Sequence, residues 1–373
     1  FRPCYTGKTP GSSSVGFKHI LEGLIMKSNI TITQIAQESG VSVATVSRFL
    51  NGKVPVSADK KARIEAVVRK YDFTPNALAR GLISKRTMTL GVILPDITNP
   101  YFATIFQEVQ RCAAEEGYSV YLCNTRFHHG DAPIDETGYF RMMMDKKVDG
   151  ILIIGGQLDM VEITPAYKEA LNRLSASLPV VAAGREISGA GCIFIDSENG
   201  SGVTTAYNYL SSLGHKDIAF VGGQPGVTIT ETRLEAYKKA AAASGREIRE
   251  DLISLSDYYL PDGYQAAEAL ISRNAPFTAV ITMNDNVALG AIRAFADHGL
   301  SVPRDVALIS CDRFYFADYT IPRLTSIHHH SRRWGQMVVR TLIQAVQGST
   351  ENARITFPPE LIIGESCGSH LQH

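Results

Sequence analysis

The sequence of 373 residues lacks any run of about 18 consecutive apolar residues, the length that a membrane-spanning helix needs. Its first 25 residues also lack the apolar core of a secretory signal peptide. They contain no methionine and are rich in glycine and serine. We therefore expect a cytoplasmic protein without a membrane segment. We expect its natural start at Met26, with residues 1–25 as a disordered upstream extension.

Recognisable metal-ligand spacings and catalytic motifs are also missing. The six cysteines are scattered without a CxxC pair, and most lie in apolar segments, which indicates buried free thiols in a reducing compartment. The signatures GxSxG, GxxxxGK[ST] and HExxH do not occur. These absences argue against a disulfide-stabilised secreted protein and the common α/β hydrolase and nucleotide-binding classes. We expect no enzymatic activity, no cofactor and no metal.

Net charge is absent too, because 37 basic residues balance 37 acidic ones, but the two signs are segregated. Residues 26–88 contain 11 Lys or Arg and 4 Asp or Glu, a net of +7. From Thr89 onward there are 23 basic and 32 acidic residues, a net of −9. A small basic segment beside an acidic body is typical of a chain in which one domain neutralises DNA phosphates.

The stretch 31–51, TITQIAQESGVSVATVSRFLN, predicts two helices joined by a tight turn. Thr31 and Gln34 have the spacing of a capping box, and Gly40 supplies the backbone freedom of the turn. The second helix, 43–50, exposes small and polar side chains at its start, which suits the DNA major groove. A helical hairpin without a nucleic-acid role has the same periodicity, but the basic charge of the segment favours DNA binding.

Side-chain chemistry suggests which residues meet DNA. We assign base-edge contacts to Val43, Ala44 and Arg48, because small apolar groups suit thymine methyls and arginine suits guanine. Phosphate contacts or helix capping are expected of the neighbouring hydroxyl and amide side chains, namely Thr31, Ser42, Thr45, Ser47 and Asn51.

A third helix over 58–71 should close this basic unit, and FTPNALARGL follows it at 73–82. The roughly two helical turns in that segment are too short to be stable alone. Together, TITQIAQESGVSVATVSRFLNG and FTPNALARGL resemble the LacI/GalR family of bacterial transcriptional repressors. The resemblance implies that hinge helices of two subunits pair in the minor groove and insert Leu82 at a central CG step. It implies hinge contacts from Asn76, Ala79, Arg80 and Leu82.

From Thr89 onward, short apolar strands alternate with amphipathic helices, which predicts an α/β body of parallel, doubly wound sheets. This part exceeds one such sheet, so two lobes are expected. The predicted fold is an all-α helix-turn-helix head and hinge helix joined to a two-lobed body similar to periplasmic binding proteins. The predicted boundaries are 26–74 for the DNA-binding domain, 75–88 for the hinge and linker, 89–195 with 329–357 for the N-terminal lobe, and 196–328 with 358–367 for the C-terminal lobe.

Polar side chains follow the predicted strands, at the carboxyl ends where open α/β sheets bind ligands. With aromatic neighbours they predict a cleft for a polyhydroxylated effector, and the family resemblance implies the same region. The predicted effector-binding residues are Asp96, Asn99, Tyr101, Phe102, Arg185, Arg233, Asn284, Asp285, Asp312 and His329. As an alternative, Asn284 and Asp285 cap the helix that follows them.

The arginines leave the ligand class open between a neutral mono- or disaccharide, which the family implies, and a sugar acid such as a uronate. Gly184 before Arg185 departs from the pattern of pentose binders. The segment His328-His329-His330 is interpreted as a crossover with His329 facing the cleft, because adjacent residues of an extended chain point to opposite sides. Trp334 is interpreted as a packing residue.

The resemblance also implies a nucleoid-associated bacterial homodimer on a pseudopalindromic double-stranded operator with a central CG. A tail without leucine heptads argues against a tetramer. An exported sugar-binding protein is the main alternative, but it would carry a signal peptide and no basic head. Whether the effector releases or strengthens DNA binding, and whether a co-regulating protein takes part, stays open at this stage.

Overall fold

The computed structural model describes residues 30–51, 56–71, 73, 86–126, 135–197, 199–349 and 357–371. The chain divides into two compact units, Phe1–Lys85 and Arg86–His373. No helix within the described ranges is long and apolar enough to span a membrane. The expected extension 1–25 and the predicted hinge contacts Asn76, Ala79, Arg80 and Leu82 lie outside the described residues.

The first unit contains α2 (Ile32–Ser39), α3 (Val43–Asn51) and α4 (Ala58–Lys70). Thr31 and Gln34 form the predicted capping box, in which each side chain accepts a hydrogen bond from the backbone N–H of the other residue. Gly40 ends α2 in the left-handed region, at φ +63°. Tyr71 ties the end of α4 to α2, because its hydroxyl donates to the Glu38 carboxylate. The three helices enclose a small core of Ile35, Ala36, Val46, Ile64 and Val67.

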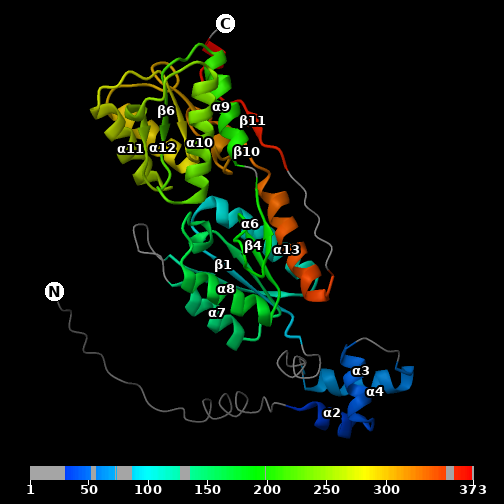
Figure 1. Ribbon diagram of the computed structural model, residues 1–373. Helices are drawn as coiled ribbons and strands as arrows, with labels where there is room; N and C mark the ends of the chain where they lie inside the picture. The colour runs from blue at the N-terminus through cyan, green and yellow to red at the C-terminus, as the bar shows by residue number, and fades with distance from the viewer. Residues whose placement is uncertain are drawn as a thin grey trace, which may run out of the picture. The chain divides into compact units, whose positions relative to one another are not determined.

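The second unit is built on two sheets (Figure 1). The first has the order β2-β1-β3-β4-β5, and all its strands are parallel. Its strands are β1 (Thr89–Leu94), β2 (Ser119–Asn124), β3 (Gly150–Ile154), β4 (Val180–Ala183) and β5 (Ile193–Ile195). Its helices are α6 (Pro100–Glu115), α7 (Glu136–Asp145), α8 (Pro165–Ser177) and α13 (Ser331–Gln347), with a 3-10 turn, η1 (Gly156–Asp159), after β3.

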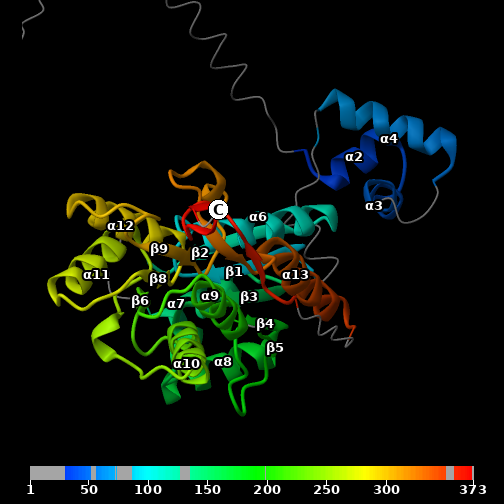
Figure 2. The same ribbon diagram turned by 90° about the horizontal axis from the view of Figure 1, so that it is seen from above.

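Helices cover both faces of this first sheet, as Figure 2 shows from above. Successive residues of β1 and β3 point to opposite faces, so Val92 and Leu152 belong to one core while Ile93 and Ile151 belong to another. The first of these cores is closed by side chains of α6 and α13, and the second by side chains of α7 and α8. Strands β1 and β3 are buried along almost their whole length. Their sequences are therefore almost continuously apolar.

The second sheet has the order β11-β10-β9-β8-β6-β7. Its strands are β6 (Ile218–Val221), β7 (Ile253–Ser254), β8 (Ala279–Thr282), β9 (Ala307–Ser310), β10 (Thr325–His328) and β11 (Glu360–Ile362). Its helices are α9 (Gly200–Ser212), α10 (Thr228–Ala243), α11 (Leu260–Ser272) and α12 (Asp285–Asp297), with short 3-10 turns η2 (Glu250–Leu252), η3 (Ala317–Tyr319) and η4 (Ser369–Leu371). The predicted α/β class is confirmed, but β11 pairs antiparallel to β10, which the expectation of purely parallel sheets missed.

The chain passes between the two sheets after β5, after β10 and again after α13. Helix α13 follows a strand of the second sheet, yet it packs on the first sheet beside α6. The helix therefore belongs to the N-terminal lobe, with β1–β5, although most of the C-terminal lobe precedes it in sequence.

Candidate functional site

In the first unit, α3 presents the side chains that were predicted to read bases. Val43, Ala44 and Arg48 are exposed, whereas Val46 on the opposite face is buried in the core of the unit. Ser42 caps the helix, because its hydroxyl accepts from the backbone N–H of Thr45 at 3.2 Å. Thr31 is engaged in the cap of α2, Ser47 is partly buried, and Asn51 is the last residue of α3.

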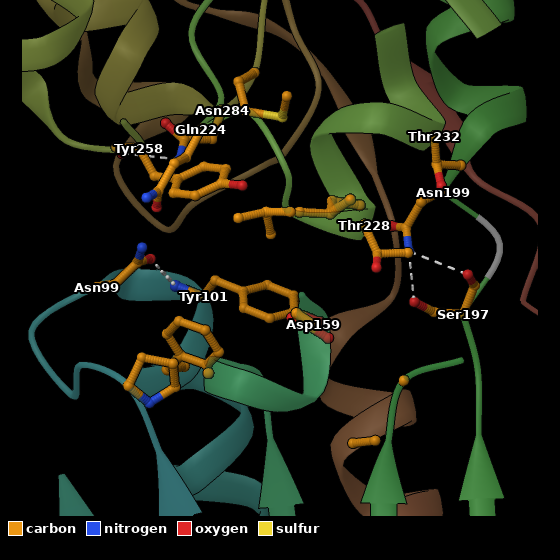
Figure 3. A pocket seen from close by; sticks show the side chains of 18 of the residues that line it. Asn99, Tyr101, Asp159, Ser197, Asn199, Gln224, Thr228, Thr232, Tyr258 and Asn284 are labelled. Carbon is orange, nitrogen blue, oxygen red and sulfur yellow. Dashed lines mark hydrogen bonds between the residues drawn. The ribbon is translucent and has the colours of Figure 1, made fainter. Parts of the chain in front are cut away.

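In the second unit, a cavity of about 610 Å³ lies between the two lobes (Figure 3). Segments that follow the carboxyl ends of β1, β3, β4 and β5 line it from one lobe, and segments after β6, β8 and β9 line it from the other. Figure 3 shows Tyr101 and Tyr258 extending toward the cavity from opposite lobes. Its wall combines flat rings with amide, hydroxyl and carboxylate groups, as a polyhydroxylated ligand requires. The aromatic residues in the wall are Tyr101, Phe102, Tyr258, Tyr259 and Trp334.

Most of the predicted effector contacts lie in this wall. These are Asn99, Tyr101, Phe102, Arg185, Arg233, Asn284 and Asp312. Asn99 and Asn284 also cap helices, because their side-chain oxygens accept from the backbone N–H groups of Tyr101 and Val287. Each of the two asparagines therefore caps a helix and also lines the cavity.

Asp96, Asp285 and His329, predicted as direct contacts, lie behind the wall instead. Asp96 accepts hydrogen bonds from the backbone N–H of Thr98 and the hydroxyl of Tyr259, both at 2.8 Å. The ring of His329 lies beside the Cys311 carbonyl, 2.9 Å from its oxygen.

Asp285 is the most buried of these three side chains, with no exposed surface. Its carboxylate accepts from the backbone N–H of Phe314 at 2.6 Å, so it holds the loop after β9 against α12. Burial raises the pKa of Asp285 to about 7, because the low-dielectric interior disfavours the charged form.

Arg233 and Asp312 form a buried ion pair at the cavity wall. The Nη2 group of Arg233 donates to Asp312 Oδ1 at 2.8 Å, and Nη1 donates to the Met283 carbonyl at 2.5 Å. Burial disfavours the guanidinium charge, but the attraction of Asp312 outweighs it and raises the pKa of Arg233 above its usual value. The Nε atom of Arg233 is buried and has no hydrogen-bond partner within the described residues.

Arg185 joins the two lobes at the rim of the cavity. Its Nη2 group donates to the carbonyls of Met160 and Val161 in one lobe, and its Nε donates to the hydroxyl of Thr228 in the other. Beside it, the backbone N–H of Val161 donates to the carbonyl of Gly226 at 2.9 Å.

A second interlobe contact consists of Arg126 and Asp257, whose side chains lie 3.2 Å apart. The bond from Tyr259 to Asp96 also joins the two lobes. Together with the contacts of Arg185, these bonds hold the lobes closed around the cavity.

Several cavity residues were missed at the sequence level. Asp159 is the most consequential: burial, with the charges of Glu136 and Asp196 adding to it, raises the pKa of its carboxyl to about 7. The rule that ligands meet strand ends would have found some of the others, had it been applied after β5 and β6. The further polar residues in the wall include Asp196, Ser197, Asn199, Gln224, Thr228 and Thr232.

Trp334 is both a packing residue, as predicted, and part of the cavity wall. Its indole N–H is buried and has no hydrogen-bond partner in the described part of the chain. The same holds for Arg233 Nε, so within the described residues both donors are unsatisfied, and both nitrogen atoms are buried behind the wall rather than exposed to the cavity.

Two parts of the chain match known families, one in each unit. Residues 31–76 match the family described as bacterial regulatory proteins, lacI family. Residues 207–367 match the periplasmic binding protein-like domain.

Curated relatives extend the likeness to nearly the whole chain. The HTH-type transcriptional repressor PurR of Pasteurella multocida is 32% identical over 91% of this chain and 99% of its own length. The catabolite control protein A of Priestia megaterium is 31% identical over 90% of this chain and 98% of its own.

Solved structures show a similar arrangement. The complex of the transcriptional regulator CelR with cellobiose is 26% identical, with a TM-score of 0.66, over 90% of this chain and 99% of that one. The Lac repressor dimer bound to operator and the anti-inducer ONPF has a TM-score of 0.78 over 91% of this chain and 99% of that one. At 23% identity, the latter supports the fold alone.

Proposed function

Because the chain belongs to the lacI family and is a DNA-binding transcriptional regulator, we propose that a neutral carbohydrate bound between its lobes controls its operator affinity. The proposal rests on the observation that the arginines of the cavity wall already have partners within the protein. Arg185 and Arg233 are engaged by acceptors of the protein itself. Arg126 pairs with Asp257 in the same way.

An acidic ligand is disfavoured by the charges in the wall. A carboxylate or phosphate would have to displace the existing partners of the arginines and would also meet the carboxylate of Asp196. Breaking a buried ion pair without replacing it is costly. A neutral sugar needs no such exchange, because its hydroxyls can donate to Asp159 while the arginines keep their partners. We therefore favour a neutral saccharide over the sugar acid that the sequence left open.

Closure of the lobes supports a control mechanism. A ligand shifts the equilibrium between lobe arrangements only by its differential affinity for them. A ligand that contacts Tyr101 from one lobe and Tyr258 from the other binds best when the lobes are closed. In the proposal, this closure sets the DNA affinity of a homodimeric repressor, and the hinge residues Asn76, Ala79, Arg80 and Leu82 act on the operator, with Leu82 at its central CG.

Binding of carbohydrate is tested by thermal unfolding with glucose, maltose, cellobiose, glucuronate, glucose 6-phosphate and adenine as probes. We expect stabilisation by a neutral saccharide, which amounts to about 2.7 kcal/mol at a concentration 100 times its Kd. Operator affinity with and without that sugar then gives the direction of control. Stabilisation by adenine alone would show that the carbohydrate assignment is wrong, and stabilisation by the two anionic sugars alone would show that the ligand is not neutral.

Matched variants locate the ligand. Asp159→Asn should weaken the stabilisation, because the carboxylate that accepts sugar hydroxyls is lost. Asp145→Asn, at the exposed end of α7, should leave it unchanged. An equal response of both variants would place the ligand elsewhere.

Base reading by α3 is tested with operator sequences selected from a random DNA library. Arg48→Ala should reduce discrimination at one base pair by about 1–3 kcal/mol, because a bidentate contact to guanine is lost. Arg173→Ala, an exposed change on α8, serves as the control. Equal losses of Arg48→Ala on selected and random DNA would mean that Arg48 contacts phosphate rather than a base.

A further inference from the structure

Outside the cavity, three potential metal ligands converge where the chain crosses from β10 into α13. The ligand atoms of His328, His330 and Glu360 all lie within 4.8 Å of one another. We propose that these side chains bind a divalent transition metal ion such as Zn²⁺. The site is separate from the effector cavity, because none of the three residues lies in the cavity wall.

The backbone places the three side chains on one side of the crossover. His328 and Glu360 are directly opposite each other in the antiparallel pair of β10 and β11. His330 follows the end of β10 by two residues, and its ring lies beside that of His328, with 4.6 Å between ring centroids. His329 points the other way, toward Cys311 and Arg233. The sequence prediction of no metal is thus replaced by this proposal for the alternate histidines, His328 and His330.

The distances fit a metal ion. His330 Nε2 and Glu360 Oε1 are 3.3 Å apart. Ligands about 2.0–2.1 Å from Zn²⁺ in a tetrahedral arrangement are about 3.3 Å from one another, so this pair already has the required spacing. The ligand atom of His328 lies within 4.8 Å of the other two. His330 has a left-handed backbone, φ +53°, which few non-glycine residues adopt and which helps orient its ring.

The donor set and its surroundings suit the ion. Two imidazoles and one carboxylate bind zinc and related metals, and they leave one position open for water. The Glu360 side chain is 59% exposed, so an ion can enter from solvent. Two cationic side chains lie nearby, but Arg313 is paired with Asp318 at 2.6 Å and Arg333 stacks on the ring of Phe357.

The test uses full-length protein without a histidine tag, stripped with EDTA, dialysed, and titrated with Co²⁺ and then Zn²⁺. We expect one Co²⁺ per chain, visible d–d absorption bands, and displacement by Zn²⁺. Thiolate-to-metal charge transfer should be absent, which distinguishes this site from the cysteines. No saturable uptake, or a thiolate band, would overturn the proposal.

Variants assign the ligands. His330→Asn keeps a residue type that tolerates the left-handed backbone, and Glu360→Gln keeps the shape of an exposed side chain. Each should weaken metal binding at least tenfold, the smallest loss typical even of outer-sphere partners. His370→Asn, in η4, should bind as the unaltered protein does. Thermal unfolding in EDTA checks that each variant is folded, and unchanged affinity of folded His330→Asn and Glu360→Gln would refute the site.

Discussion

At the residue scale, removing one partner of the buried ion pair of Arg233 and Asp312 should strongly reduce the stability of the fold. Arg233→Met should lower the free energy of unfolding by about 3–5 kcal/mol, because it leaves the Asp312 carboxylate without its partner in a poorly hydrated site. Urea denaturation measures this loss. Arg293→Met removes an ion pair on the exposed face of α12 and should cost no more than about 1 kcal/mol.

A second substitution sharpens this prediction. Adding Asp312→Leu to Arg233→Met removes the stranded charge, so part of the lost stability should return. Equal losses for Arg233→Met and Arg293→Met would show that burial contributes little to the strength of the pair.

Glu136 should make stability depend on pH. Its carboxyl is 1% exposed and accepts from Gln157 N and Tyr167 Oη, and burial raises its pKa to about 7. Between its unfolded pKa near 4.5 and this value, the folded state binds a proton that the unfolded state has lost. Stability therefore falls as pH rises through this window, by up to about 1.4 kcal/mol per pH unit, and levels off above it.

The measurement compares Glu136→Gln with the unaltered protein in urea at several pH values across that window. The difference in unfolding free energy should grow in favour of the variant with rising pH. Glu169→Gln, an exposed change on α8, should produce no such trend. A pH-independent difference for Glu136→Gln would mean that Glu136 is ionised in the fold.

At the element scale, periodicity predicted the helices and strands well, because burial on one or both faces leaves a direct imprint on the sequence. It did not predict the direction of β11, since parallel and antiparallel edge strands have the same alternation. The strand-end rule found Asn99 and Asn284 in the cavity wall.

The same rule did not separate neighbouring residues. Asn284 lines the cavity, whereas Asp285, one position later, turns inward to the backbone of Phe314. The inward orientation of Asp285 depends on the loop after β9, which is distant from Asp285 in sequence. The approach of Glu360 to His328 and His330 could not be predicted for a similar reason, because Glu360 belongs to a separate strand.

The contacts between lobe rims predict how effector affinity responds to substitution. Asp257→Asn weakens the partly buried pair with Arg126 and substitutes no residue of the cavity wall, because Asp257 is not part of that wall. Closure then becomes less favourable, and affinity for the stabilising sugar should fall several-fold. Calorimetric titration measures this change. Asp251→Asn, whose ion pair lies within one lobe, is the control, and an unchanged affinity for Asp257→Asn would show that this contact does not support closure.

At the scale of the whole molecule, an exposed apolar segment after β9 suggests where two copies meet. Tyr315, Tyr319 and Ile321 are 77%, 85% and 96% exposed. Large side chains so exposed in one short segment are unusual for a surface that faces only water. We predict a homodimer, with about twice the 40.7 kDa mass of one chain in sedimentation.

Ile321→Arg should shift this dimer toward monomer, because it places a charge where apolar surface is buried. Ile248→Arg, at another exposed position of the second unit, should not. A stable tetramer of the unaltered protein would contradict the predicted assembly, and a dimer insensitive to Ile321→Arg would place the interface elsewhere.

The late position of α13 has a consequence for biosynthesis. Its side chains complete the core over Val92 and Leu152, but the ribosome makes this helix only after β10. Until α13 is made, only α6 covers this face of the first sheet, so the N-terminal lobe completes its core only after β10 of the second sheet has been synthesised. We expect chaperones to bind the partly covered apolar face during synthesis. A chimera that exchanges lobes must accordingly carry α13 with the first lobe rather than join two continuous halves.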